Sequence, residues 1–137
     1  MDWMLMPLKR YADFSGRSCR QEYWMFFLFQ ILVIVVFGIL FGVLVGFGGR
    51  PEDNPLFIPL IILFLIAAAG LFIIPSIALT VRRFHDQDKS GWFYLLNFIP
   101  SAGGIIVLVF MCIKGTEGPN RFGEDPLGAA RLGDVFS

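Results

Sequence analysis

Three long stretches of this chain contain no Asp, Glu, Lys or Arg, and they constrain its fold more than any other feature. They cover residues 23–49, 54–81 and 90–113. A helix needs about 20 apolar residues to cross the roughly 30 Å hydrocarbon core of a bilayer, and each stretch is long enough. The stretches do not alternate between apolar and polar residues, as the strands of a membrane β-barrel do. The sequence therefore predicts an all-α integral membrane protein with three hydrophobic helical segments.

Composition supports this class of protein. The 137 residues are 56% hydrophobic and 16% charged, whereas a soluble domain has about 45–50% apolar and about 25% charged residues. The formal net charge is zero, so no basic field suggests a nucleic-acid partner. Cys19 and Cys112 are the only cysteines, which is too few for a disulfide framework or a zinc site. We therefore expect no nucleic-acid partner, no metal and no cofactor.

The charge pattern divides the chain into three parts. Residues 1–22 mix apolar residues with cations, and we expect them to lie at the level of the cytoplasmic headgroups. Residues 23–113 are expected to form a single transmembrane domain. Its helices are predicted at about 19–47, 56–83 and 92–113. Residues 114–137 form a polar tail rich in Gly and Pro.

The third apolar segment allows two interpretations. Residues 92–113 are numerous enough to span the membrane once, and isolated Pro and Gly are common in membrane helices. A simple span is therefore the first expectation. However, the stretch Pro100–Gly104 interrupts the segment near its middle. Two half-helices of about nine residues would each rise only about 13 Å, which fits a hairpin that re-enters the membrane.

The distribution of Lys and Arg predicts the sidedness of the chain. Cytoplasmic flanks of membrane helices carry the excess of these residues. This rule places the N-terminus and the 81–91 loop in the cytoplasm, and the 48–55 loop outside. A simple third span then gives seven Lys and Arg inside and four outside, whereas a re-entrant third segment gives ten against one.

Three polar motifs flank the apolar segments: YADFSGRSCRQEYW at 11–24, RRFHDQDKSGW at 82–92 and GTEGPNRFGEDP at 115–126. Their order and spacing resemble a family of small bacterial inner-membrane proteins, domain of unknown function 805, over roughly residues 8–126. The positions that match the family pattern are Phe14, Gly16, Arg17, Arg20, Glu22, Tyr23, Trp24, Arg82, Arg83, His85, Asp86, Ser90, Gly91, Trp92, Gly115, Thr116, Gly118, Asn120, Arg121, Phe122, Gly123, Asp125 and Pro126. The resemblance implies a multi-pass fold and a bacterial inner-membrane location. It implies no reaction, ligand or catalytic residue.

The two adjacent arginines of the middle motif end the second predicted helix. Cations at a helix C-terminus interact favourably with the helix dipole and mark a membrane boundary, which is the simplest interpretation of Arg82 and Arg83. A second interpretation adds an ion pair between one of them and Glu22, which the predicted topology places on the same side of the membrane.

His85 and Asp86 form the dipeptide most suggestive of chemistry. A histidine can serve as a general acid or base, or as a pH sensor. However, no serine or cysteine nucleophile is recognisably paired with it. We therefore expect a structural turn, in which Asp86 or Asp88 caps the following helix. Catalysis and the sensing of a ligand or proton remain as alternatives.

The tail motif is typical of turns. Gly115, Gly118 and Gly123 are expected to supply positive φ angles. If the tail returns to the cytoplasmic side, Arg121 and Asp125 can complete one polar cluster with the other two motifs. If the tail lies outside, the three motifs cannot meet.

We expect a non-enzymatic membrane component that binds lipids or a partner protein. The candidate functional residues are Arg17, Arg20, Glu22, Arg82, Arg83, His85, Asp86, Lys89 and Trp92, with Asn120, Arg121, Gly123 and Asp125 in the tail. The five cations of the first two motifs in this set could bind anionic headgroups, each contributing about 1 kcal/mol. Because three short segments bury little surface, a homo-oligomer or a partner membrane protein is expected. The alternatives are an oligomeric channel or transporter component, and an enzyme that acts on lipid phosphates through His85 and the arginines.

Overall fold

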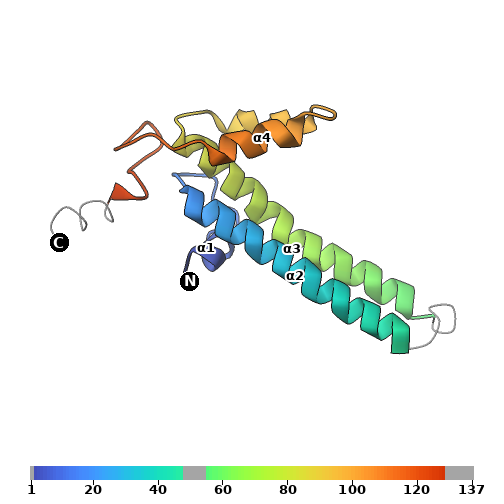
Figure 1. Cartoon of the computed structure of the whole chain (residues 1–137). Helices are drawn as coiled ribbons and strands as arrows, with labels where there is room; N and C mark the ends of the chain where they lie inside the picture. The colour runs from blue at the N-terminus through green and yellow to red at the C-terminus, as the bar shows by residue number, and fades with distance from the viewer. Residues whose placement is uncertain (1, 48–54, 129–137) are drawn as a thin grey trace.

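The computed structural model describes residues 2–47 and 55–128. Its helices, in chain order, are α1 (Asp2–Lys9), α2 (Arg20–Phe47), α3 (Phe57–Asp86), the 3-10 helix η2 (Gly91–Phe98) and α4 (Gly103–Cys112) (Figure 1). The described part of the chain contains no strand beyond an isolated bridge between Asn120 and Gly123. The predicted all-α class is confirmed.

Helices α2 and α3 are the two long apolar helices, and they lie side by side as an antiparallel pair (Figure 1). Their 28 and 30 residues rise about 42 and about 45 Å, more than the thickness of the hydrocarbon core. Both are long and apolar enough to cross a membrane. A hydrogen bond of 2.7 Å from Gln30 Nε2 to Ser76 Oγ joins them. Their outward-facing apolar side chains, such as Ile34 and Ile66, are 69% and 65% exposed, as expected for surfaces that contact lipid.

The third apolar segment forms a hairpin of two short helices. The expected single helix over 92–113 is therefore wrong, and the predicted break at Pro100–Gly104 is confirmed. Helix η2 ends at Phe98, and α4 begins at Gly103 and runs back along it (Figure 1). Proline lacks the N–H that a helix needs and disfavours a helical residue before it, and Ser101 turns the chain with a φ of 66°. The two limbs rise only about 15 Å each, which is half of the hydrocarbon core.

All the polar motifs lie at one end of the molecule. At this end α2 begins, α3 ends, and both limbs of the η2–α4 hairpin have their outer ends. A small apolar core of Phe84, Val107 and Met111 joins α3 to α4 there. Helix α1 packs against α2 and α3, and the hydroxyl of Tyr11 donates a hydrogen bond to the carbonyl of Gly70 on α3. We call this region the polar end.

A buried ion cluster as candidate functional site

Five charged side chains are buried together at the polar end, and we call them the ion cluster. They come from the loop before α2, from the first turn of α2 and from the last turns of α3. The residues are Arg17, Glu22, Arg82, Arg83 and Asp86, and each is at most 5% exposed. Buried charges are costly unless they are paired and hydrogen-bonded. Every member of the cluster is paired.

Asp86 pairs with two arginines at once. Its Oδ1 lies 2.9 Å from Nη2 and 3.0 Å from Nε of Arg17, and its Oδ2 accepts a hydrogen bond from Arg83. Arg83 precedes Asp86 by three residues, so the two side chains share one face of α3. Asp86 therefore does not cap the next helix. Ser90 takes that role, because its Oγ accepts a hydrogen bond from the backbone N–H of Trp92.

The second pair joins α2 to α3. Arg82 Nη2 lies 3.3 Å from Glu22 Oε1, and both side chains are at most 2% exposed. This confirms the predicted ion pair and assigns it to Arg82, since Arg83 turns toward Asp86. The backbone N–H of Ser18 also donates a 3.2 Å hydrogen bond to the carbonyl of Arg82. The loop before α2 is thus fixed to the end of α3 by side-chain and backbone contacts.

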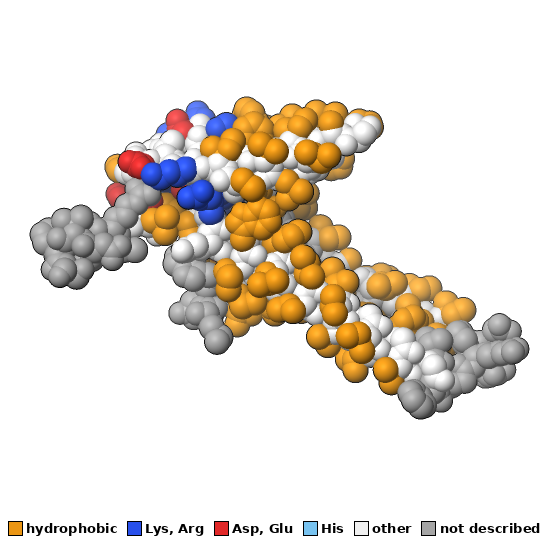
Figure 2. Space-filling model, in the orientation of Figure 1, with side chains coloured by type: hydrophobic (Ala, Val, Ile, Leu, Met, Phe, Trp, Pro, Cys, Tyr) orange, Lys and Arg blue, Asp and Glu red, His pale blue; other side chains and the backbone are white. Residues whose placement is uncertain are grey.

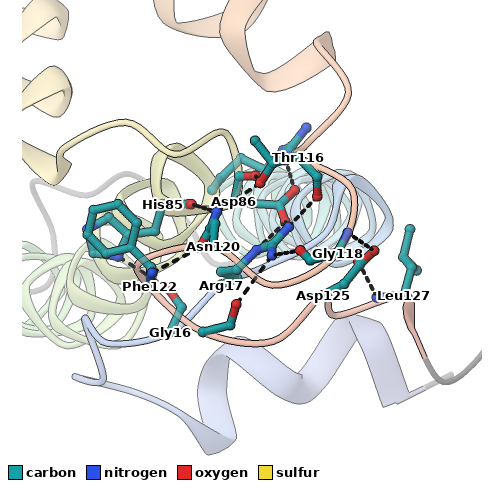
Figure 3. A network of polar contacts seen from close by, with 12 residues as sticks. Gly16, Arg17, His85, Asp86, Thr116, Gly118, Asn120, Phe122, Asp125 and Leu127 are labelled. Carbon is teal, nitrogen blue, oxygen red and sulfur yellow. Dashed lines mark hydrogen bonds and ion pairs between the residues drawn. The ribbon is translucent and has the colours of Figure 1, made fainter.

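The tail supplies hydrogen-bond acceptors to Arg17 of the cluster. Three guanidinium groups face only two carboxylates, and the remaining N–H groups need acceptors. Arg17 donates to the carbonyls of Thr116 at 2.5 Å and Gly118 at 2.6 Å in the tail (Figure 3), and Arg83 donates to the carbonyl of Ile113 at the end of α4. The tail therefore lies at the polar end with the other two motifs. This position differs from the one expected of a simple third span, which would carry the tail to the opposite ends of α2 and α3.

The turn chemistry of the tail shapes these contacts. Gly118 and Gly123 have φ angles of 72° and 135°, as predicted. Gly115 does not belong to that group. A Cβ atom at Gly115 would overlap the Asp86 carboxylate, so the tail needs glycine here for close approach. Asn120 then joins the tail to the α3 end, because its Nδ2 donates to the carbonyl of His85 at 2.9 Å.

Arg121 and Asp125 lie outside the buried ion cluster. Arg121 Nε is 3.1 Å from Asp88 Oδ1, and both side chains are largely exposed. Asp125 Oδ2 accepts a 3.3 Å hydrogen bond from the backbone N–H of Gly118. Of the two alternatives, the structure shows the one in which the three motifs meet, through backbone contacts and Asn120, but Arg121 and Asp125 do not complete the cluster. Arg121 and Asp125 stabilise the tail from its periphery.

His85 lies beside the ion cluster and takes no part in its ion pairs. Its ring stacks on Phe122 with centroids 4.0 Å apart and planes 3° apart, and Nδ1 lies 3.2 Å from the carbonyl oxygen of Gly16 (Figure 3). None of the hydrogen bonds of the described residues joins His85 to a hydroxyl or a thiol. Within residues 2–47 and 55–128, no group of His, Cys, Asp and Glu could hold a metal ion.

The remaining candidates face outward. Arg20 is exposed and donates to the carbonyl of Cys112 at 3.3 Å. The ammonium of Lys89 lies 5.4 Å from the ring centroid of Phe110, and Trp92 is 77% exposed. The five cations that were expected to bind headgroups therefore fall into two groups. Arg17, Arg82 and Arg83 are buried and paired, whereas Arg20 and Lys89 are accessible at the surface.

One residue outside the predicted set also holds this region together. Gln87 is 6% exposed, and its side-chain amide donates to the carbonyl of Phe110 on α4. The sequence contains one indication that Gln87 has a role: it is an uncharged polar residue between Asp86 and Asp88 in the middle motif. Nothing in the sequence indicated its partner on α4.

These features define a small helical membrane protein whose three polar motifs meet around one buried ion cluster. The chain belongs to the family described as Protein of unknown function (DUF805), whose model matches residues 11–124. It is similar to the inner membrane protein YhaI of Escherichia coli K12, with 41% identity over 92% of this chain and 96% of the relative. It is also similar to the inner membrane protein YhaH of the same strain, with 43% identity over 92% of this chain and 97% of the relative. No solved structure gives a significant match.

Proposed function

We propose that this chain is a non-enzymatic component of the bacterial inner membrane whose polar end lies in the cytoplasm. Every Lys and Arg among the described residues falls within 9–20, 82–89 or 114–121, and these segments meet at the polar end. Cytoplasmic flanks carry such an excess. The two Escherichia coli relatives are inner membrane proteins by name, which supports the location.

We further propose that the polar end binds anionic lipid headgroups through Arg20 and Lys114. The observation that supports this proposal is that Arg20 and Lys114 lie next to the same surface depression. Both side chains are exposed, and both line a small depression where α2 begins and α4 ends. Figure 2 shows Lys and Arg side chains gathered beside the apolar surface of the hairpin. Cations at such a boundary are attracted by the negative cytoplasmic leaflet.

The buried arginines do not contribute to this binding. Arg82 and Arg83 are fully enclosed, and their charges are already engaged by Glu22 and Asp86. Lys114 also has a neighbour, Glu117, but that ion pair is exposed on both sides. An exposed pair of this kind contributes little and is easily exchanged for another anion. The proposal therefore depends on the exposed cations of the depression alone.

The test is the retention of phosphatidylglycerol by the purified full-length protein, measured by native mass spectrometry against phosphatidylethanolamine. Each cation near an anionic surface contributes about 1 kcal/mol, so the variant Arg20→Gln with Lys114→Gln should bind phosphatidylglycerol about ten- to thirtyfold more weakly. Arg121→Gln is the matched control, because it removes an exposed cation that does not line the depression. Equal retention by the double variant and the control would refute the proposal.

We also propose that the chain self-associates through α2. Gly38, Gly42 and Gly46 follow one another at intervals of four residues, and a Cβ atom at any of them would meet no other described atom within 4 Å. Small residues at this spacing let membrane helices approach closely. Gly42→Leu should lower the dimer fraction in nanodiscs, whereas Val43→Leu on the same helix should not. A channel or transporter component, the second candidate function, requires such an oligomer and predicts ion flux in reconstituted vesicles.

A further inference from the structure

A cleft of about 500 Å³ opens between the end of α3 and the start of η2. It is separate from the depression that holds Arg20 and Lys114. Its walls are mainly apolar and aromatic, with Phe14, Val81, Trp92 and Leu95 among them, and the ring of His85 also lines it. A volume of this size and a mostly apolar wall with few polar groups are typical of small-molecule sites.

The cleft lies where the polar end meets the apolar hairpin. His85 belongs to the polar middle motif, whereas Trp92 and Leu95 belong to η2 and are 77% and 51% exposed. Trp and Tyr side chains are enriched at the membrane–water interface, and Trp92 and Tyr94 both line the cleft. A molecule in the cleft would therefore have its polar group at headgroup level and its chain beside the membrane.

The hydrogen bonding of His85 determines what that polar group can be. Nδ1 lies 3.2 Å from the carbonyl oxygen of Gly16, which can only accept a hydrogen bond, so Nδ1 carries the proton. In the neutral ring Nε2 is then an acceptor. Gly91 leaves this atom open, since a Cβ atom there would lie 3.3 Å from Nε2. None of the hydrogen bonds among the described residues involves Nε2.

The charge of the cleft limits the ligand further. Its described lining includes no Lys, Arg, Asp or Glu, so it offers neither a cation for a phosphate nor an anion for an amine. An uncharged head that donates one hydrogen bond fits this lining best.

We propose that this cleft binds a neutral membrane amphiphile that carries a hydroxyl group. The hydroxyl donates a hydrogen bond to His85 Nε2, and the hydrocarbon chain lies against Phe14, Trp92 and Leu95. Diacylglycerols and long-chain alcohols belong to this chemical class. The site is independent of the anionic-lipid proposal, because it shares no residue with the Arg20 and Lys114 depression.

The first test uses the fact that His85 is the only histidine of the chain. In full-length protein labelled with ¹⁵N-histidine, purified through a tag without histidine and placed in nanodiscs, the two ring nitrogens give one pair of signals. Nδ1 should be the protonated nitrogen. Dodecanol should move the Nε2 signal toward its hydrogen-bonded position, while dodecyl methyl ether, which has no donor, should leave it in place. A protonated Nε2, or equal effects of the two ligands, would overturn the proposal.

The second test measures affinity with Trp92 as the reporter, after Trp3 and Trp24 are replaced by Phe. Brominated dodecanol should quench Trp92 at about three- to tenfold lower concentration in the bilayer than the brominated methyl ether, the factor expected from one hydrogen bond. His85→Phe keeps a ring above Phe122 but removes the acceptor, so it should abolish this difference. His85→Gln keeps an acceptor and should retain it.

Two further outcomes would contradict the proposal. Stronger quenching by brominated dodecanoate than by the brominated alcohol would indicate that the His85 ring is protonated and that the cleft binds an anion. An alcohol preference that persists in His85→Phe would show that Nε2 is not the acceptor. If His85→Phe does not fold, as judged by circular dichroism, the ¹⁵N signals of the unsubstituted protein decide the question alone.

Discussion

A single residue, Asp86, connects the loop before α2, the end of α3 and the tail. Asp86 engages Arg17 from the loop before α2 and Arg83 from its own helix. Its backbone carbonyl also accepts hydrogen bonds from the N–H and the hydroxyl of Thr116 in the tail, at 2.8 and 3.0 Å. Removing its charge would leave two buried guanidinium groups without their counter-ion.

Asp86→Asn should therefore be strongly destabilising. Breaking a buried ion pair by removing one partner costs about 3–5 kcal/mol, and we expect a loss of this size in the free energy of unfolding in mixed detergent micelles. Asp88→Asn is the matched control two residues away. Its pair with Arg121 is exposed, so the change should cost at most about 1 kcal/mol. Similar losses in both variants would show that the ion cluster does not stabilise the fold.

The two cysteines should differ in reactivity. Cys19 is 1% exposed, and burial raises the pKa of its thiol above the ordinary value. A raised pKa keeps the thiol protonated to higher pH, and the thiolate is the reactive form. Cys112 is exposed. At pH 8 a maleimide should add once to the folded protein, at Cys112, and twice after denaturation. Peptide mapping by mass spectrometry checks both sites, and rapid modification of Cys19 in the folded protein would contradict its burial.

Pairing at the residue scale was only partly predictable from the sequence. The Glu22 pair with an α3 arginine followed from their common side of the membrane, because the positive-inside rule and helix length set that side. The engagement of Asp86 by Arg17 did not follow, since it depends on how the loop before α2 bends across the end of α3. The sequence predicts a turn residue at Gly115, and only the structure shows the Asp86 carboxylate packed against it.

At the scale of elements, the η2–α4 hairpin is the part that the sequence left open. Length and hydropathy fit one span, and Pro100 with the two glycines fits a break. The contacts that distinguish the hairpin from a single span cannot be read from the sequence. Gly103 packs against the backbone carbonyls of Leu96 and Asn97, while the far end of α4 is tied to α3 by the Gln87 hydrogen bond.

The adjacent glycines of the turn provide a matched test of this hairpin. A Cβ atom at Gly103 would come within 2.8 Å of the Asn97 carbonyl oxygen and closer still to that of Leu96, whereas one at Gly104 would meet no atom within 4 Å. Overpacking of this kind typically costs about 1–3 kcal/mol. Gly103→Ala should lower the melting temperature and increase the distance between spin labels at positions 95 and 108. Gly104→Ala should change neither, and equal behaviour of the two variants would mean that the limbs do not pack in this way.

At the scale of the whole molecule, the ion cluster and the broken hairpin are two aspects of one arrangement. A third span would carry the tail across the membrane, away from Arg17 and Arg83. The half-length limbs return it to the polar end, where its carbonyls accept hydrogen bonds from Arg17 and the carbonyl of Ile113, directly before the tail, accepts one from Arg83. The sequence allows a single span or a hairpin for the third segment, and the structure shows the hairpin together with the tail contacts at the polar end.

This arrangement predicts that both ends of the chain lie in the same compartment. A reporter fused after Ser137 that fluoresces only in the cytoplasm should be active, and a phosphatase reporter that works only in the periplasm should be inactive at the same position. Position 101, at the tip of the hairpin, should sit about 15 Å deep in the cytoplasmic leaflet. In a variant with Cys112→Ser, a cysteine placed at Ser101 should therefore resist water-soluble maleimide from either side while reacting with a membrane-permeant one. Periplasmic activity at Ser137, or labelling of position 101 from the periplasm, would instead restore a third full span.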